Sequence, residues 1–182
     1  MNILISTFSL CVIVLTFPVP LFHIILHRWL SLWRKVPYLY YAGWAIIWIA
    51  LGLFVFQEKT FAQIPLVSFG QEIQFIGFIF ATLGIFLVLW SLSTIGPKRF
   101  FVWAALRPNK VEQKIITKGP FLLLRHPAYV GYRLLAFGCF LFTGWWSTLA
   151  VFVWLFLSTP LAVRLEEREL AERVLKSEKL TF

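Results

Sequence analysis

Residues 118–133 read KGPFLLLRHPAYVGYR and are the most informative stretch of an otherwise apolar chain. Cationic, imidazole and phenolic groups gather here beside two prolines and two glycines, directly before a long apolar run. Pro127 has no backbone N–H and a fixed φ, so it favours the first position of a helix and puts His126 at the cap. Tyr129 and Arg133 then share one face of that helix, because residues four apart are neighbours. The stretch therefore predicts a helix whose N-terminal end is polar and has a fixed geometry.

The composition is that of an integral membrane protein. Of the 182 residues, 60% are hydrophobic and 19% aromatic, which is not a soluble composition. A spanning helix needs roughly 20 apolar residues, and the apolar runs leave no room for a soluble catalytic domain. Any active site must therefore be built from helix ends and short loops. Cys11 and Cys139 both lie in apolar runs, which favours core packing over a disulfide or a structural zinc site.

We predict an all-α, polytopic membrane protein with about five transmembrane helices in a single membrane domain, residues 1–182. The expected spans are 3–26, 38–56, 73–95, 127–146 and 147–163. The last two are joined by a turn of a few residues around Gly144, so they should form a tight antiparallel hairpin. The hairpin brings residues 125–133 next to residues 164–170, although some forty residues separate them in the sequence.

The loop charges orient these spans. Lys and Arg are frequent after the first span, before the fourth and in the C-terminal tail, whereas the opposite loops offer Lys59 beside Glu58 and Glu72, and an uncharged turn. The positive-inside rule then predicts an external N-terminus and a cytoplasmic C-terminus, in an inner or cytoplasmic membrane. The catalytic region would be cytoplasmic, at about 96–133 and 164–182. This asymmetry and attraction to anionic lipids account for the net charge of +9, so no nucleic-acid partner is expected.

His23 and His27 lie four residues apart at the end of the first span, which is the spacing of a paired metal ligand. A third ligand is missing, and His27 falls in a basic interfacial stretch. We therefore expect no metal site.

Prolines and glycines mark two structural features of the spans. Pro18 and Pro20 predict a kink in the first span, and Gly77 and Gly84 predict a close contact between the third span and a neighbouring helix. No nucleotide-binding glycine motif, metalloprotease motif or Ser/His/Asp grouping is present, and the chain contains no Asp. Rossmann cofactor binding, P-loop hydrolysis and zincin chemistry are therefore excluded.

The polar residues at the hairpin base have one purely structural interpretation. Arginines would bind lipid phosphates, a tyrosine would lie among the headgroups, and glutamates would pair with arginines along the tail helix. The residues concerned are Arg125, His126, Tyr129, Arg133, Arg164, Glu166 and Glu167.

The order of these residues favours an enzyme. The sequence KGP at 118–120 is followed by RHPAYVG at 125–131, then by an apolar hairpin, and then by RLEE at 164–167. This order resembles the isoprenylcysteine carboxyl methyltransferase family and its bacterial and phospholipid methyltransferase relatives. The resemblance covers about residues 116–170, and the first three spans match only as generic membrane helices.

The resemblance implies a methyltransferase that depends on S-adenosylmethionine, lacks a Rossmann domain and methylates a lipophilic acceptor entering from the bilayer at the cytoplasmic face. The methionine end of that cofactor carries a carboxylate and an ammonium, so it suits a cation beside an acid. The cofactor-binding residues carried over from the family pattern are Gly119, Arg125, His126, Pro127, Tyr129, Gly131, Glu166 and Glu167.

Helix geometry separates the two glutamates. Adjacent helical residues point about 100° apart, so Glu166 and Glu167 cannot make the same contact. Arg164 and Glu167 are three residues apart and share a face, and we expect them to form the inward, catalytic pair. Methyl transfer is an in-line displacement, which requires alignment and water exclusion more than acid–base chemistry. An amine or thiol acceptor must also lose a proton, for which His126 or Glu167 would be the candidates.

Two other functions stay open. A membrane reductase of the same fold would use a nicotinamide cofactor, although the short loops offer little surface for a dinucleotide. A non-catalytic accessory protein of the membrane would need no cofactor.

Overall fold

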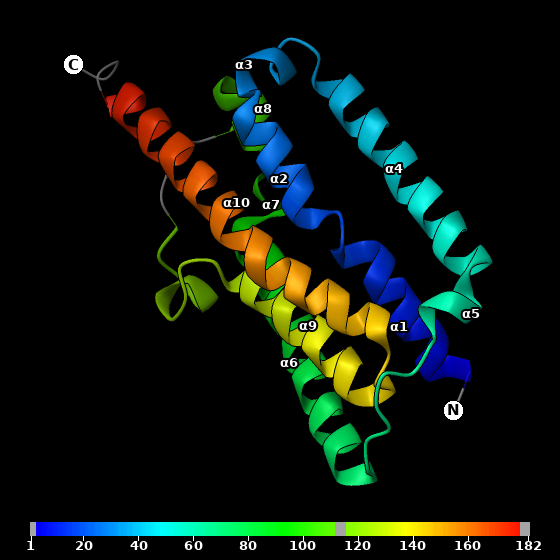
Figure 1. The fold of residues 1–182 in the computed structure, drawn as a ribbon. Helices are drawn as coiled ribbons and strands as arrows, with labels where there is room; N and C mark the ends of the chain where they lie inside the picture. Colours follow the sequence, from blue (N-terminus) through cyan, green and yellow to red (C-terminus); the bar gives the residue numbers. More distant parts are fainter. Residues whose placement is uncertain (1–2, 112–115, 179–182) are drawn as a thin grey trace.

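The computed structural model describes residues 3–111 and 116–178 (Figure 1). Residues 112–115 and 179–182, which belong to the expected cytoplasmic region, lie outside the described residues. Within the described ranges every regular element is a helix, which confirms the all-α prediction. In chain order these are α1 (Ile3–Thr16), α2 (Val19–Arg28), α3 (Leu30–Trp33), α4 (Pro37–Gln57), α5 (Lys59–Ala62), α6 (Gln71–Ile95), α7 (Pro97–Phe100), α8 (Trp103–Leu106), η1 (Pro108–Lys110), η2 (Gly119–Leu122), α9 (Pro127–Thr143) and α10 (Trp146–Glu178).

Four segments of the described chain are long and apolar enough to cross a membrane. They are Ile3–Arg28, Pro37–Gln57, Gln71–Ile95 and Trp146–Glu172. These segments coincide with the first, second, third and fifth expected spans and support an integral membrane protein. The fourth expected span corresponds to α9, whose 17 residues rise about 26 Å, slightly less than the roughly 30 Å of a hydrocarbon core. The number of five spans therefore stays a prediction.

The first span is bent, as its prolines predict. α1 ends at Thr16 and α2 begins at Val19, with Phe17 and Pro18 between them. The buried hydroxyl of Thr16 donates a hydrogen bond to the carbonyl of Val12 at 2.7 Å, so it is satisfied within its own helix. Beyond the bend, α2 runs beside α10 (Figure 1).

Glycines allow α6 and α9 to pack with their backbones in contact. A Cβ atom built on Gly84 would lie 2.6 Å from the carbonyl oxygen of Gly131, and one on Gly77 would lie 2.9 Å from that of Gly138. Such distances are shorter than real Cβ contacts, and a backbone oxygen cannot rotate away as a side-chain end can. The close contact predicted at Gly77 and Gly84 is confirmed, with α9 as the partner helix.

The predicted hairpin joins α9 to α10 through Gly144, which adopts a left-handed φ of +64°. Glycine takes this conformation without strain and commonly ends helices. The carbonyl of Gly144 accepts hydrogen bonds from the N–H groups of Leu66 and Val67, at 2.7 and 3.2 Å. The turn is therefore tied to the segment that precedes α6.

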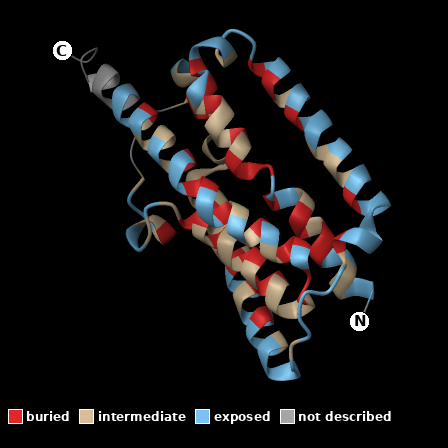
Figure 2. Cartoon of the chain, viewed as in Figure 1, coloured by how far each residue is buried: buried red, intermediate tan, exposed pale blue. Residues whose placement is uncertain are grey.

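The helix that contains the fifth expected span, α10, extends past residue 163, the expected end of that span. It continues as one helix to Glu178, with Pro160 inside it. Its buried residues recur every three, four or seven positions and so form one stripe along the helix, which Figure 2 shows as spaced buried segments. The stripe includes Val151, Leu155, Thr159, Ala162 and Glu169.

Large apolar side chains cover the outer surfaces of α4 and α6. Ile46, Ile49 and Leu53 on α4, and Phe75 and Phe78 on α6, are all exposed. Apolar faces of this extent are avoided on soluble monomers, but hydrocarbon tails solvate them without cost. The two helices therefore present lipid-facing surfaces.

We expect Gly84→Ala to destabilise the protein by about 1–3 kcal/mol, because the added methyl group overpacks a contact made of backbone atoms. Gly43→Ala on α4 is the matched control: a Cβ there meets nothing within 4 Å, and alanine is the better helix former by about 0.5–1 kcal/mol. Thermal unfolding in detergent, followed by circular dichroism, would compare the two variants. Equal melting temperatures would contradict the close packing of α6 on α9.

Candidate functional site

The hairpin places the start of α9 beside the C-terminal part of α10. Pro127 is the first residue of α9, and His126 is its N-cap with φ −131° and ψ 67°, as the sequence predicts. Tyr129 and Arg133 then both turn toward α10, where Arg133 donates a hydrogen bond to the hydroxyl of Thr159. Their shared helix face is confirmed.

Glu167 on α10 meets the two residues that precede α9. Its Oε1 lies 3.0 Å from Nε2 of His126 and 3.3 Å from Nη1 of Arg125. The Arg125 side chain is 86% exposed and that of Glu167 is 39% exposed, so this ion pair contributes little to stability. Such an exposed pair is suited to bind a zwitterion. Arg125 can release Glu167 and bind the carboxylate of the ligand, while Glu167 binds its ammonium.

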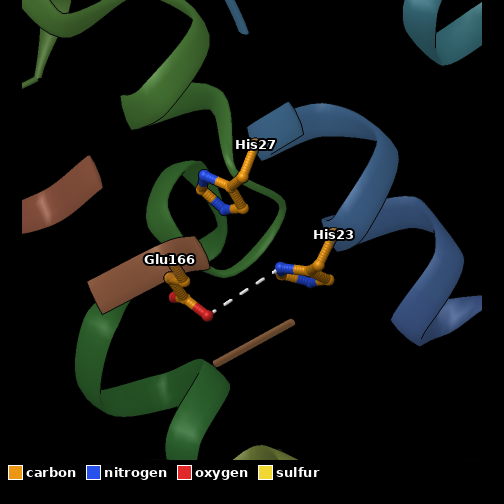
Figure 3. A group of neighbouring side chains, drawn as sticks. All are labelled: His23, His27 and Glu166. Atoms are coloured by element: carbon orange, nitrogen blue, oxygen red, sulfur yellow. Dashed lines mark ion pairs between the residues drawn. The ribbon is translucent and has the colours of Figure 1, made fainter. Parts of the chain in front are cut away.

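Glu166 points in another direction, toward α9 and α2. Its Oε2 accepts a hydrogen bond from the hydroxyl of Tyr129 at 3.2 Å and lies 3.9 Å from Nδ1 of His23. Tyr129 is buried, and its ring meets that of His23 edge to face, with centroids 5.4 Å apart. Figure 3 shows His23 and His27 of α2 beside Glu166. The adjacent glutamates thus contact different groups, as their angular separation predicts.

The structure does not turn Arg164 inward. This residue is exposed, so the expected inward pair of Arg164 and Glu167 is wrong in its first member. The reason is helical phase. The buried stripe of α10 includes Ala162 and Glu169, and Arg164 follows Ala162 by two residues, or about 200° around the helix. Glu167 precedes Glu169 by the same step and its side chain is 39% exposed, but it still reaches His126 and Arg125. A catalytic role for Arg164 stays a prediction, and the outward position of this residue does not favour it.

Three of the expected cofactor residues shape the backbone around the site. Gly119 has a φ of +59°, and a Cβ there would lie 2.7 Å from Oγ1 of Thr94 at the end of α6. Gly131 lies in the α6–α9 contact, where its Cβ would be 2.8 Å from the carbonyl oxygen of Gly84. Pro127 is buried at the start of α9. These residues fix the loop and the helix that carry the polar groups, and direct cofactor contacts stay a prediction for them.

An ion pair that the sequence did not suggest lies one turn further along α10. Nη2 of Arg34 donates to Oε1 of Glu169 at 2.9 Å, and Nε of Arg34 donates to the carbonyl of Ala105 at 2.9 Å. The Glu169 side chain is only 10% exposed. Arg34 directly follows α3 and Ala105 belongs to α8, so the pair ties these short helices to α10. Its partners are 135 residues apart in the chain, and no local pattern could have indicated them.

Comparison with known protein families matches the part of the chain that contains the hairpin and the candidate site. The family model described as Phospholipid methyltransferase matches residues 73–177, which is more than half of the chain. Every cofactor-binding and catalytic residue expected from the sequence falls within this range. No curated protein and no solved structure matches the chain.

Proposed function

Because the chain belongs to the phospholipid methyltransferase family of membrane methyltransferases, we propose that it methylates a lipophilic acceptor with S-adenosylmethionine at the cytoplasmic face of the membrane. The observation that carries this proposal is the meeting of Arg125, His126 and Glu167 at the base of the hairpin. These groups lie at the start of α9 and in the C-terminal part of α10. They are accessible to solvent and complementary in charge to an amino-acid zwitterion.

Each residue of this group has a distinct proposed role. Arg125 holds the carboxylate of the cofactor's methionine end, and Glu167 takes its ammonium. His126, fixed at the cap of α9, adds a further polar contact, and the ring of Tyr129 forms a wall of the pocket. When bound, S-adenosylmethionine supplies an activated methyl group, so the protein's tasks are alignment and water exclusion.

The acceptor is proposed to enter sideways from the bilayer. The exposed apolar surfaces of α4 and α6 support an enzyme surrounded by lipid. A carboxylate acceptor would need no base. An amine or thiol acceptor would lose its proton to His126 or Glu167, whose side chains already share a contact of 3.0 Å.

The membrane orientation follows from the basic residues around the site. We predict that a reporter fused after Phe182 is active only in the cytoplasm and that one fused before Met1 is active only outside, because Lys and Arg are retained on the cytoplasmic side. Paired cytoplasmic and periplasmic reporter enzymes would measure this. A C-terminus found outside would place the candidate site on the wrong face.

S-adenosylhomocysteine should raise the melting temperature of the purified protein, because a ligand that binds only the folded state stabilises it by mass action. The measurement is thermal unfolding in detergent, with NADPH as a parallel ligand. A shift with NADPH alone would favour the membrane reductase. No shift with either ligand at millimolar concentration would favour the non-catalytic accessory protein.

The two glutamates should differ in their effect on cofactor binding. Removing one partner of a charge pair that is buried in a complex costs on the order of 2–5 kcal/mol. The bound ligand would cover Glu167 and pair its ammonium with it, so Glu167→Gln should weaken binding of S-adenosylhomocysteine by about tenfold or more. Glu166→Gln should change it by only a small factor, since that carboxylate faces Tyr129 and His23.

Isothermal titration calorimetry would measure both affinities, with Glu172→Gln as the control. Glu172 is an exposed acid on the same helix that pairs with Arg168, so its loss should leave the affinity unchanged. A larger loss at Glu166 than at Glu167 would contradict the assigned roles.

A further inference from the structure

Folding brings two histidines of α2 and one glutamate of α10 together. Each of His23, His27 and Glu166 offers one ligand atom, and these three atoms lie within 4.8 Å of one another (Figure 3). The sequence argued against a metal because a third ligand was missing, and the packing of α2 on α10 supplies that ligand. We propose that His23, His27 and Glu166 bind a divalent transition-metal ion, with zinc as the representative ion.

The chemistry of the donors selects this class of ion. Two imidazoles and one carboxylate form a known set of zinc ligands, with a fourth coordination position left open. Magnesium and calcium prefer sites built entirely of oxygen atoms. The mixed nitrogen and oxygen donors therefore favour a transition metal over a hard alkaline-earth ion.

The observed positions need only small side-chain movements to close around an ion. The four-residue spacing places both imidazoles on one face of α2, with ring centroids 6.1 Å apart and planes inclined by 28°. Nδ1 of His23 lies 3.9 Å from Oε2 of Glu166. Atoms that share a tetrahedral zinc ion at about 2.1 Å lie roughly 3.4 Å apart. All three ligand atoms lie within 4.8 Å of one another, so binding an ion would draw them closer together by rotation of their side chains.

Burial of His23 is a second observation that points to a ligand. Its Nδ1 is buried and makes no hydrogen bond to any residue that the structure describes, and its side chain is 13% exposed. Buried polar atoms normally have a partner, and a metal ion would be one. The Glu166 side chain is 33% exposed, so an ion could reach the group from that side.

The surroundings also contain the second layer of contacts that metal sites require. A carboxylate that binds a metal is usually oriented by a hydrogen bond from another group. The buried hydroxyl of Tyr129 gives Glu166 such a bond, at 3.2 Å to Oε2. Tyr129 would therefore orient the carboxylate toward α2.

This ion site adjoins the proposed cofactor contact but uses a different carboxylate, since the ion is assigned to Glu166 and the cofactor to Glu167, with Tyr129 between them. A bound ion would fasten α2 to α10. Its open coordination position could accept a water molecule, or an oxygen or sulfur atom of the acceptor.

The test uses the full-length protein, purified in detergent without a histidine tag and stripped of metal with EDTA. Titration with zinc chloride alone, checked by elemental mass spectrometry, should give one ion per chain and a higher melting temperature. His23→Ala, His27→Ala and Glu166→Gln should each weaken zinc binding roughly tenfold or more. The visible spectrum of bound Co²⁺ should change with the same three substitutions.

Glu167→Gln is the matched control, since it removes the adjacent carboxylate and should leave zinc affinity unchanged while it weakens binding of S-adenosylhomocysteine. Failure of the wild-type protein to bind one zinc ion would overturn the proposal whether or not each variant folds. Equal zinc affinity in wild type and Glu166→Gln would also overturn it. Zinc binding without S-adenosylhomocysteine binding would support the ion site and contradict the methyltransferase proposal alone.

Discussion

The backbone contact between α6 and α9 is the constraint on which the rest of the site depends. In a bilayer there is little hydrophobic force to press helices together, so close packing has to supply the attraction. Gly84 and Gly131 remove the side chains that would keep the helix axes apart. With α9 fixed against α6, the position of its capped N-terminus is fixed as well. His126 and Tyr129 can then be presented to α10 in one arrangement.

Because α10 is one continuous helix, neighbouring polar residues on it point in different directions. A break after residue 163 would let the glutamate pair adopt any orientation, but α10 runs unbroken to Glu178. A regular helix turns by about 100° per residue, so Glu167 faces the start of α9 while Glu166 faces Tyr129 and α2. Two neighbouring carboxylates therefore enter different chemical environments, and Glu167 meets both His126 and Arg125.

The sequence predicts the features that arise from local rules. The cap at His126, the bend near Pro18, the turn at Gly144 and the membrane character each follow from a few neighbouring residues and are found in the structure. The rotation of α10 about its axis is not local. Spacing alone relates Arg164 to Glu167, but only the position of the buried stripe shows that Arg164 faces outward. The packing of α2 against α10 was likewise beyond reach, so the carboxylate beside His23 was missed.

Ionisable groups are expensive inside a membrane protein and tend to be retained where they are paired or functional. In this chain they gather where α2, α9 and the C-terminal part of α10 meet. The pair of Arg34 and Glu169 has a structural explanation, because it ties α10 to the short helices after the first span. His23 and Glu166 come from different helices, and 3.9 Å separates Nδ1 of His23 from Oε2 of Glu166, which is too long for a hydrogen bond. Glu166 and Glu167 are consecutive residues of one helix, so any rotation of α10 that moves one carboxylate also moves the other, and the two sides of the site cannot change independently.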